Sequence, residues 1–124
     1  MILVDTSVWI NHLRSGNTEL ARLLTESVVL GHPSITGEIS LGSLRNRGEV
    51  IGLLQRLPCA DVASDDEVLH LIEREDLAGA GIGYVDAQLL AATRLTADAR
   101  LWTLDRKLAM VAARLGLSIG DSPR

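Results

Sequence analysis

The chain begins Met1-Ile2-Leu3-Val4-Asp5-Thr6-Ser7, a short apolar run followed by an acid and two hydroxyl residues. Residues 2–4 are consecutive apolar residues, which predict a short, buried strand of a parallel sheet. Asp5 follows directly, at the carboxyl end of that strand, where open α/β sheets place their functional crevice. The competing interpretation of Asp5 is the N-cap of a helix over residues 6–13.

Short apolar runs alternate with helical patterns along the rest of the chain. Four further strands are predicted, at Val28–Leu30, Ala60–Ala63, Arg100–Leu104 and Leu117–Ile119. Asn17, and Ser64 with Glu67 three residues later, are typical of helix starts, and Gly116 is typical of a helix end. This order predicts an α/β fold: one Rossmann-like domain over residues 1–124, with a central, mainly parallel sheet flanked by helices.

The composition excludes several classes of protein. Apolar residues make up 47% of the chain and charged residues 23%, which is typical of a folded domain and not of a disordered tail. The formal net charge of −4 argues against binding nucleic acid by bulk electrostatics. With no Phe, and only Trp9, Trp102 and Tyr84 as rings, an aromatic platform for stacking bases is not expected.

The first residues also indicate where the protein acts. No basic segment and no long apolar run stands at the N-terminus, so neither a signal peptide nor a membrane span is expected. The lone Cys59 cannot form an internal disulfide, which suits a reducing compartment. We therefore expect a soluble, cytoplasmic protein.

A second acid occupies the same kind of position as the first. Asp105 follows the predicted strand that contains Leu101-Trp102-Thr103-Leu104. The two-residue period of a strand puts Thr103 and Asp105 on one side. Capping of the helix predicted over residues 106–115 is the alternative role for Asp105.

Glu38 lies in a helix-like stretch of small and apolar residues, 34–42. On a helix, Glu38 shares one side with Leu41, Gly42 and Arg45, so its carboxylate projects over small or apolar neighbours. A solvated glutamate is the alternative.

Asp86 is the most informative acid. It stands in the first turn of an apolar segment, residues 84–92, which predicts a buried helix. An exposed carboxylate there merely complements the helix dipole. A buried one costs several kcal/mol unless a cation accompanies it, and few basic residues are near in sequence.

Four converging carboxylates, from Asp5, Glu38, Asp86 and Asp105, suit a hard divalent cation, Mg²⁺ or Mn²⁺. Without a cation their mutual repulsion forces some of them to take up protons. The chemistry that follows from such a site is phosphodiester hydrolysis, in which the metal activates water and stabilises charge on the phosphate.

The order and spacing of these motifs resemble the PIN-domain nucleases. The motifs are Val4-Asp5-Thr6-Ser7 after a strand, Glu38 with Gly42, Asp86 opening an apolar helix, and Thr103-Leu104-Asp105 after a late strand. Over nearly the whole chain, their spacing is similar to that of the VapC toxins of bacterial type II toxin–antitoxin systems. The resemblance implies a PIN-like fold and a Mg²⁺- or Mn²⁺-dependent endoribonuclease that inhibits translation and growth by cutting RNA.

The resemblance also implies roles for individual residues. It assigns catalysis and metal binding to Asp5, Glu38, Asp86 and Asp105, and a supporting role to the hydroxyls of Ser7 and Thr103. It implies a homodimer, an RNA substrate and a VapB-like antitoxin that places a peptide segment, often with an arginine, near the acids. Asp98 is interpreted as a surface or turn acid, not as a fifth ligand.

Two alternatives remain open at this point. One is a PIN-domain RNA-processing nuclease outside a toxin system. The other is a receiver-like signalling domain with Asp61 as phospho-acceptor and Lys107 as a late lysine, which leaves Glu38 and Asp86 unexplained. Four basic residues are candidates for contacts to RNA phosphates, although ordinary surface charge explains each equally well: Arg45, Arg47, Arg106 and Lys107.

Overall fold

A parallel sheet of three strands lies at the centre of the computed structural model, which describes residues 1–120. The strands are β1 (Ile2–Val4), β2 (Val29–Leu30) and β3 (Arg100–Trp102), in the order β2-β1-β3. Leu3 of the central strand pairs with Leu30 on one side and with Leu101 on the other. Leu3 and Val4 are fully buried, as expected of a strand covered on both faces.

The strand predicted at Ala60–Ala63 is wrong. The chain meets the sheet one residue earlier, at an isolated parallel bridge between Gly31 and Cys59. The N–H of Asp61 then donates to Oγ1 of Thr96 at 2.8 Å instead of continuing a ladder. The segment therefore touches the edge of the sheet without becoming a strand.

The two C-terminal strand predictions are too long. The predicted strand Arg100–Leu104 ends at Trp102, because the N–H of Leu104 is taken by Oγ of Ser7 at 3.0 Å. The predicted strand Leu117–Ile119 is reduced to one parallel bridge, between Leu101 and Ser118. The prediction of a mainly parallel sheet is confirmed.

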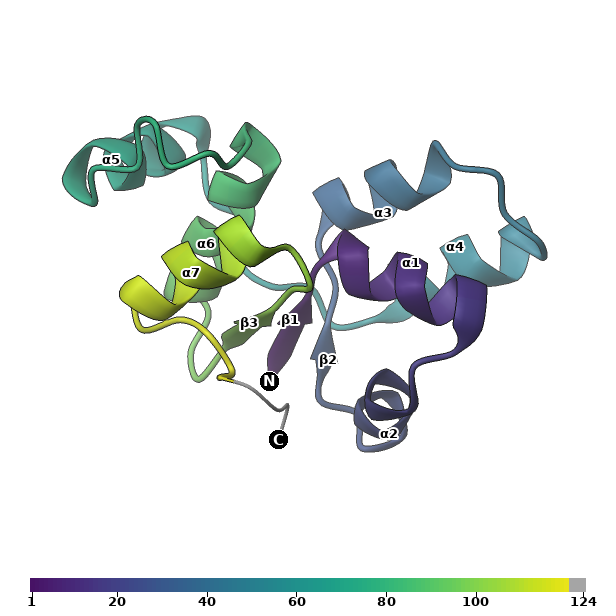
Figure 1. Ribbon diagram of the computed structural model, residues 1–124. Helices are drawn as coiled ribbons and strands as arrows, with labels where there is room; N and C mark the ends of the chain where they lie inside the picture. Colours follow the sequence, from purple (N-terminus) through teal and green to yellow (C-terminus); the bar gives the residue numbers. More distant parts are fainter. Residues whose placement is uncertain (121–124) are drawn as a thin grey trace.

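Helices occupy both sides of these strands (Figure 1). One group is α1 (Thr6–Ser15), α2 (Thr18–Thr25), α3 (Pro33–Ser40) and α4 (Arg47–Arg56). The other group is α5 (Asp65–Arg74), α6 (Tyr84–Leu95) and α7 (Arg106–Arg114). In Figure 1 the strands lie between the two groups, and the carboxyl ends of β1 and β3 lead directly into α1 and α7.

The helix starts predicted at Asn17 and Ser64 and the helix end predicted at Gly116 are confirmed. The side chain of Asn17 accepts a hydrogen bond from the N–H of Leu20, and Ser64 and Glu67 form a reciprocal capping box. Gly116, with φ +73°, follows the end of α7 in the left-handed conformation that glycine tolerates best. Within residues 1–120, no helix has the length and hydropathy needed to cross a bilayer.

The core consists of aliphatic side chains and one indole. Trp9 is 1% exposed, and the other large, fully buried side chains include Leu20, Leu23, Leu89, Leu90, Leu101 and Leu108. These residues come from α1, α2, α6, β3 and α7, so the core extends over both groups of helices. Packing of this kind holds the carboxyl ends of the strands in fixed relative positions.

Candidate active site

Two of the predicted acids lie side by side because their strands are neighbours. Asp5 follows β1 directly, and its N–H donates to the carbonyl of Trp102, the last residue of β3, at 2.9 Å. Asp105 comes three residues after Trp102, at the start of α7. The carboxyl edge of the sheet thus brings together two residues that are 100 positions apart in sequence.

Hydroxyl groups hold the Asp5 carboxylate in place. Ser7 Oγ and Thr103 Oγ1 each donate to Oδ2 of Asp5 at 2.7 Å. The two hydroxyl oxygens lie 3.2 Å apart. Because each hydroxyl has a single proton and donates it to Asp5, they do not also donate to each other. The hydroxyls in turn accept the N–H groups of Leu104 and Asp105, both at 3.0 Å.

This network argues against capping as the role of Asp5. Asp5 stands at the N-cap position of α1, but its side chain makes no cap hydrogen bond. It is 6% exposed and forms no ion pair within residues 1–120, which is rare for a buried carboxylate. Asp105, by contrast, does cap its helix: Oδ1 accepts the N–H of Leu108 at 3.0 Å.

Glu38 reaches the site from α3. Its side chain is exposed, and Oε1 accepts a hydrogen bond from Oγ1 of Thr6 at 2.7 Å. A second hydrogen bond, from Ser34 Oγ to Gln88 Oε1 at 2.8 Å, joins α3 to α6. The predicted alignment of Glu38 with Leu41, Gly42 and Arg45 on one helix is wrong, because α3 ends at Ser40.

Asp86 lies in the first turn of α6, as predicted. Its Oδ2 accepts the N–H of Gly83 at 3.0 Å, while the helix beyond it is buried from Ala87 onward over most of its length. Burial raises the pKa of Asp86, and the negative charges of three other carboxylates, Asp5, Asp105 and Glu38, raise it further. The Gly83 hydrogen bond opposes these effects without cancelling them.

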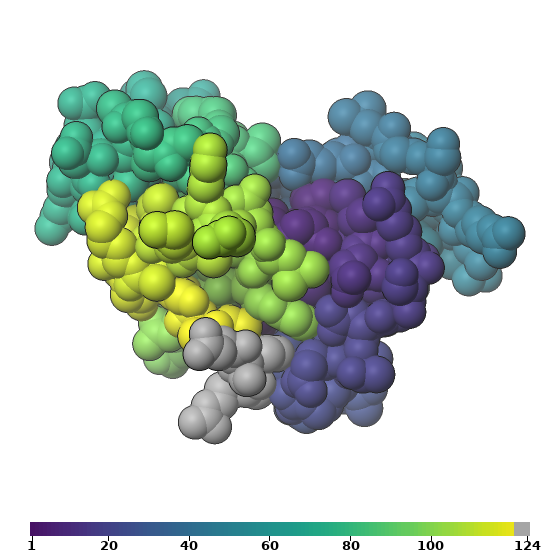
Figure 2. All heavy atoms as spheres, viewed as in Figure 1, coloured from purple at the N-terminus to yellow at the C-terminus, as the bar shows by residue number. Residues whose placement is uncertain are grey.

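The four acids therefore lie near one another, since the charges of the other three all raise the pKa of Asp86. Each lies close enough for its charge to be felt at Asp86, although they come from four separate parts of the chain. Figure 2 shows a notch in the upper outline of the molecule, between the green segment around the start of α6 and the blue segment of α3. Asp98, in contrast, is an exposed residue with φ +57° in a turn, as predicted for a surface acid.

The four carboxylates share a pattern of hydrogen bonding. In each, one oxygen is held by a protein donor: Oδ2 of Asp5, Oε1 of Glu38, Oδ2 of Asp86 and Oδ1 of Asp105. Within residues 1–120, no protein donor reaches the second oxygen of any of them. Fixed orientation with one open oxygen is what carboxylate ligands of a metal ion require.

These residues fit a hard divalent cation. Carboxylate oxygens are the preferred ligands of Mg²⁺, which usually binds one or two carboxylates and keeps several waters. In the described part of the chain, no group of three or more His, Cys, Asp or Glu side chains is arranged so that it could hold a metal ion as it stands. An ion at this edge of the sheet would need one or two of these carboxylates and several waters as its ligands.

Three functional contacts escaped the sequence analysis. The Thr6 hydroxyl holds Glu38, the Gly83 amide holds Asp86, and the Ser34–Gln88 pair joins their helices. Thr6 stands in the Val4-Asp5-Thr6-Ser7 motif, and that position beside Asp5 was the available signal. The pairing itself depends on the packing of α1 against α3, which sequence periodicity does not reveal.

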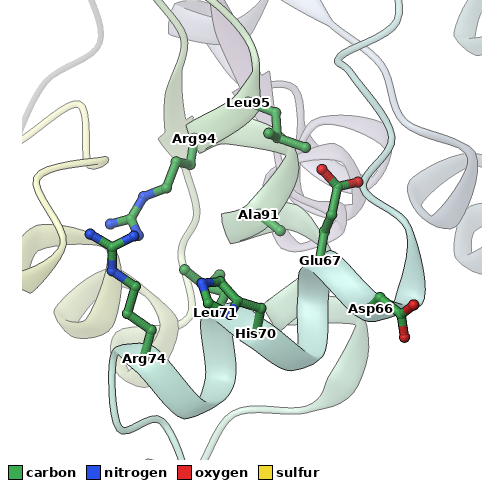
Figure 3. Close-up of a pocket in the computed structure, with 8 residues that line it drawn as sticks. All are labelled: Asp66, Glu67, His70, Leu71, Arg74, Ala91, Arg94 and Leu95. Carbon is green, nitrogen blue, oxygen red and sulfur yellow. The ribbon is translucent and has the colours of Figure 1, made fainter.

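A separate cavity of about 290 Å³ lies between α5 and α6 (Figure 3). It is lined by Asp66, Glu67, His70, Leu71, Arg74, Ala91, Arg94 and Leu95. None of the four converging acids is among these residues, so this cavity is distinct from the site at the edge of the sheet.

A parallel sheet with acids gathered at its carboxyl edge defines an α/β domain of the PIN-like class. The chain is 44% identical over 121 residues to Ribonuclease VapC32 of Mycobacterium tuberculosis, in strains CDC 1551 / Oshkosh and ATCC 25618 / H37Rv, and the alignment covers 98% of each chain. A comparison with models of protein families finds no match. The chain belongs to the VapC family of ribonucleases. This membership replaces the receiver-like alternative with Asp61 as phospho-acceptor.

Proposed function

We propose that residues 1–124 form one Mg²⁺- or Mn²⁺-dependent endoribonuclease domain that acts as the toxin of a VapBC-type pair, cutting RNA in the cytoplasm and so inhibiting translation and growth. The observation that supports metal-dependent cleavage most directly is the meeting of Asp5, Glu38, Asp86 and Asp105, each with one oxygen open. The near full-length similarity to Ribonuclease VapC32 supports RNA as the substrate.

The four acids would hold the cation. When bound, the ion would activate a water molecule, orient the scissile phosphate and neutralise the charge that develops on it. Ser7 and Thr103 keep Asp5 in one orientation, and Thr6 does the same for Glu38. Burial and neighbouring charges raise the pKa of Asp86, and a bound cation would lower it again by favouring the carboxylate.

The same cluster of four acids suggests how an antitoxin would inhibit the enzyme. A VapB-like partner that placed an arginine among the four carboxylates would satisfy their open oxygens by charge-assisted hydrogen bonds. RNA and metal would then be excluded together. We further propose a homodimer, on the family resemblance alone, which sedimentation of the purified protein would test.

The experiment that tests the activity is cleavage of single-stranded RNA by purified protein with Mg²⁺ or Mn²⁺, and with EDTA. EDTA should abolish cleavage, and the variants Asp5→Asn and Asp86→Asn should each nearly abolish it while keeping the wild-type circular dichroism spectrum. Asp98→Asn is the matched control, since it removes one exposed carboxylate outside the site and retains a residue that tolerates positive φ. Undiminished cleavage by either site variant would reject the assignment of that residue.

The toxin role has its own test. Induced expression of the wild-type chain should arrest growth, and expression of Asp5→Asn should not. Co-expression of the product of a small neighbouring gene should restore growth if that gene encodes the antitoxin. Growth arrest by wild type and Asp5→Asn alike would separate toxicity from catalysis and contradict the proposal. Sequencing the RNA ends after induction would identify the cleaved RNA.

A further inference from the structure

The side chain of Lys107 lies against Gly81. If Gly81 carried a Cβ atom, that atom would stand 2.9 Å from Cδ of Lys107, 3.3 Å from Cε and 3.1 Å from Nζ. The last three heavy atoms of the Lys107 side chain therefore occupy space that a side chain at position 81 would fill. Gly81 also has φ +83°, a conformation that favours glycine, and any side chain at this position would displace the end of the Lys107 side chain.

This contact lies between two of the acid-bearing helices. Gly81 is two residues before Gly83, whose N–H holds the Asp86 carboxylate at the start of α6. Lys107 is two residues after Asp105, in the first turn of α7. The Gly81–Lys107 contact therefore joins the segments at which the helices carrying Asp86 and Asp105 begin.

Lys107, like Arg45 and Arg106, has no hydrogen-bond or ion-pair partner among residues 1–120. The Arg47 guanidinium, by comparison, donates hydrogen bonds to the carbonyls of Ser40 and Gly42 at the end of α3. A positive charge without a protein partner, in the first turn of the helix that Asp105 caps, is available for an anionic ligand.

We propose that Lys107 is a substrate-positioning residue that binds a phosphate of the RNA backbone next to the scissile bond, and that Gly81 keeps its ammonium group there. This inference rests on the proposed ribonuclease function. Ammonium contacts to phosphate oxygens orient nucleic acids without reading their sequence. Packing of the aliphatic stem on Gly81 reduces the conformational freedom that a lysine loses when it binds.

The first test compares Lys107→Met with Arg100→Met, which removes the same charge from the first residue of β3, at the opposite end of that strand from the acids. Lys107→Met should raise KM for single-stranded RNA about fivefold to tenfold and change kcat less than about twofold. It should also flatten the dependence of log KM on log salt by about one charge. Arg100→Met should match the wild type in KM. Equal KM values for the two variants would overturn the proposal.

The second test uses two glycines with the same backbone requirement. Gly79 and Gly81 both have positive φ, but nothing lies within 4 Å of a Cβ at position 79. Gly81→Ala should raise KM as Lys107→Met does, whereas Gly79→Ala, which carries the same backbone strain, should not. In the double variant Gly81→Ala/Lys107→Met the two effects should not add, because both remove one contact. Full additivity, or equal effects of the two alanines, would contradict the role of Gly81.

A binding measurement separates this proposal from the proposed function. In the Asp5→Asn background, a fluorescent single-stranded RNA should bind about fivefold more weakly after Lys107→Met and with unchanged affinity after Arg100→Met. Absence of metal-dependent cleavage by the wild type would contradict the nuclease assignment while leaving this comparison valid. Equal affinities, or no RNA binding at all, would overturn the assignment of Lys107.

Discussion

Oγ1 of Thr103 lies 2.7 Å from Oδ2 of Asp5, although the two residues are 98 positions apart in the sequence. The contact exists because β1 and β3 pair directly, with Val4 opposite Trp102, so that both chains leave the sheet at the same place. Ser7 donates to the same oxygen at the same distance. The orientation of Asp5 is thus built into the pairing of the two strands.

Removing the Thr103 hydroxyl should impair catalysis without unfolding the protein. Thr103→Val keeps the shape of the side chain but leaves Asp5 with one hydroxyl donor, and partners of metal ligands typically contribute 10- to 100-fold. We expect kcat/KM for RNA cleavage to fall by about that factor, and Thr103→Ser to retain most of the activity. Initial rates over a Mg²⁺ titration measure this effect. A valine variant as active as the serine variant would show that the hydroxyl is dispensable.

Thr6 should act on Glu38 in the same way, but more weakly, because Glu38 is exposed and has this one donor. Thr6→Val should raise the Mg²⁺ concentration needed for half-maximal cleavage by about 10-fold, at the low end for such partners. Thr18→Val is the matched control. Thr18 is exposed and is the first residue of α2, and Thr6 is likewise the first residue of its helix, α1. The same Mg²⁺ requirement in both variants would contradict a role for the Thr6–Glu38 contact.

The acids that sequence alone located best are those whose position is local. Asp5 and Asp105 follow strands, and parallel strands place their carboxyl ends at one edge whatever the rest of the fold does. Asp86 was indicated by the apolar character of its helix, because a carboxylate is buried at a large cost in free energy unless a cation or hydrogen-bond donors accompany it. For Glu38, the resemblance to PIN-domain nucleases supplied what periodicity did not.

What sequence did not reveal depends on packing between distant elements. The helix α4 was not predicted, because Gly48 and Gly52 weaken its helix propensity and only Leu54 is fully buried in it. The Thr6–Glu38 and Ser34–Gln88 contacts each join two helices. No local pattern encodes which residues of two packed helices will face one another.

Neutralising Asp86 should stabilise the metal-free protein at neutral pH. The pKa of Asp86 is raised in the folded state, so the folded protein holds its proton at pH values where the unfolded chain has lost it. The free energy of unfolding must therefore fall as pH rises from the usual aspartate pKa through the folded value. Asp86→Asn keeps an acceptor for the Gly83 N–H and removes this penalty.

The measurement is the melting temperature of both proteins in EDTA at pH 4 and pH 7.5. We expect Asp86→Asn to melt about 2–5 °C above the wild type at pH 7.5, as a gain near 1 kcal/mol would give, and to lose that advantage at pH 4. Saturating Mg²⁺ should raise the melting temperature of the wild type more than that of the variant. Asp98→Asn should show neither effect. A stabilisation of equal size at both pH values would contradict this origin.

His32 should make the protein less stable below neutral pH. Its imidazole is 4% exposed, Nδ1 accepts the N–H of Ser34 at 3.0 Å, and burial lowers its pKa. Below about pH 6.5 the unfolded chain therefore binds a proton at His32 more readily than the folded protein does. The free energy of unfolding falls as pH falls, by at most about 1.4 kcal/mol per pH unit. His32→Asn, which can still cap α3, should remove this dependence although it lowers stability at every pH. Urea unfolding at pH 5.0–7.5 measures the slope, and the exposed His70→Asn should keep that of the wild type. Identical slopes in His32→Asn and wild type would assign the acid sensitivity to other groups.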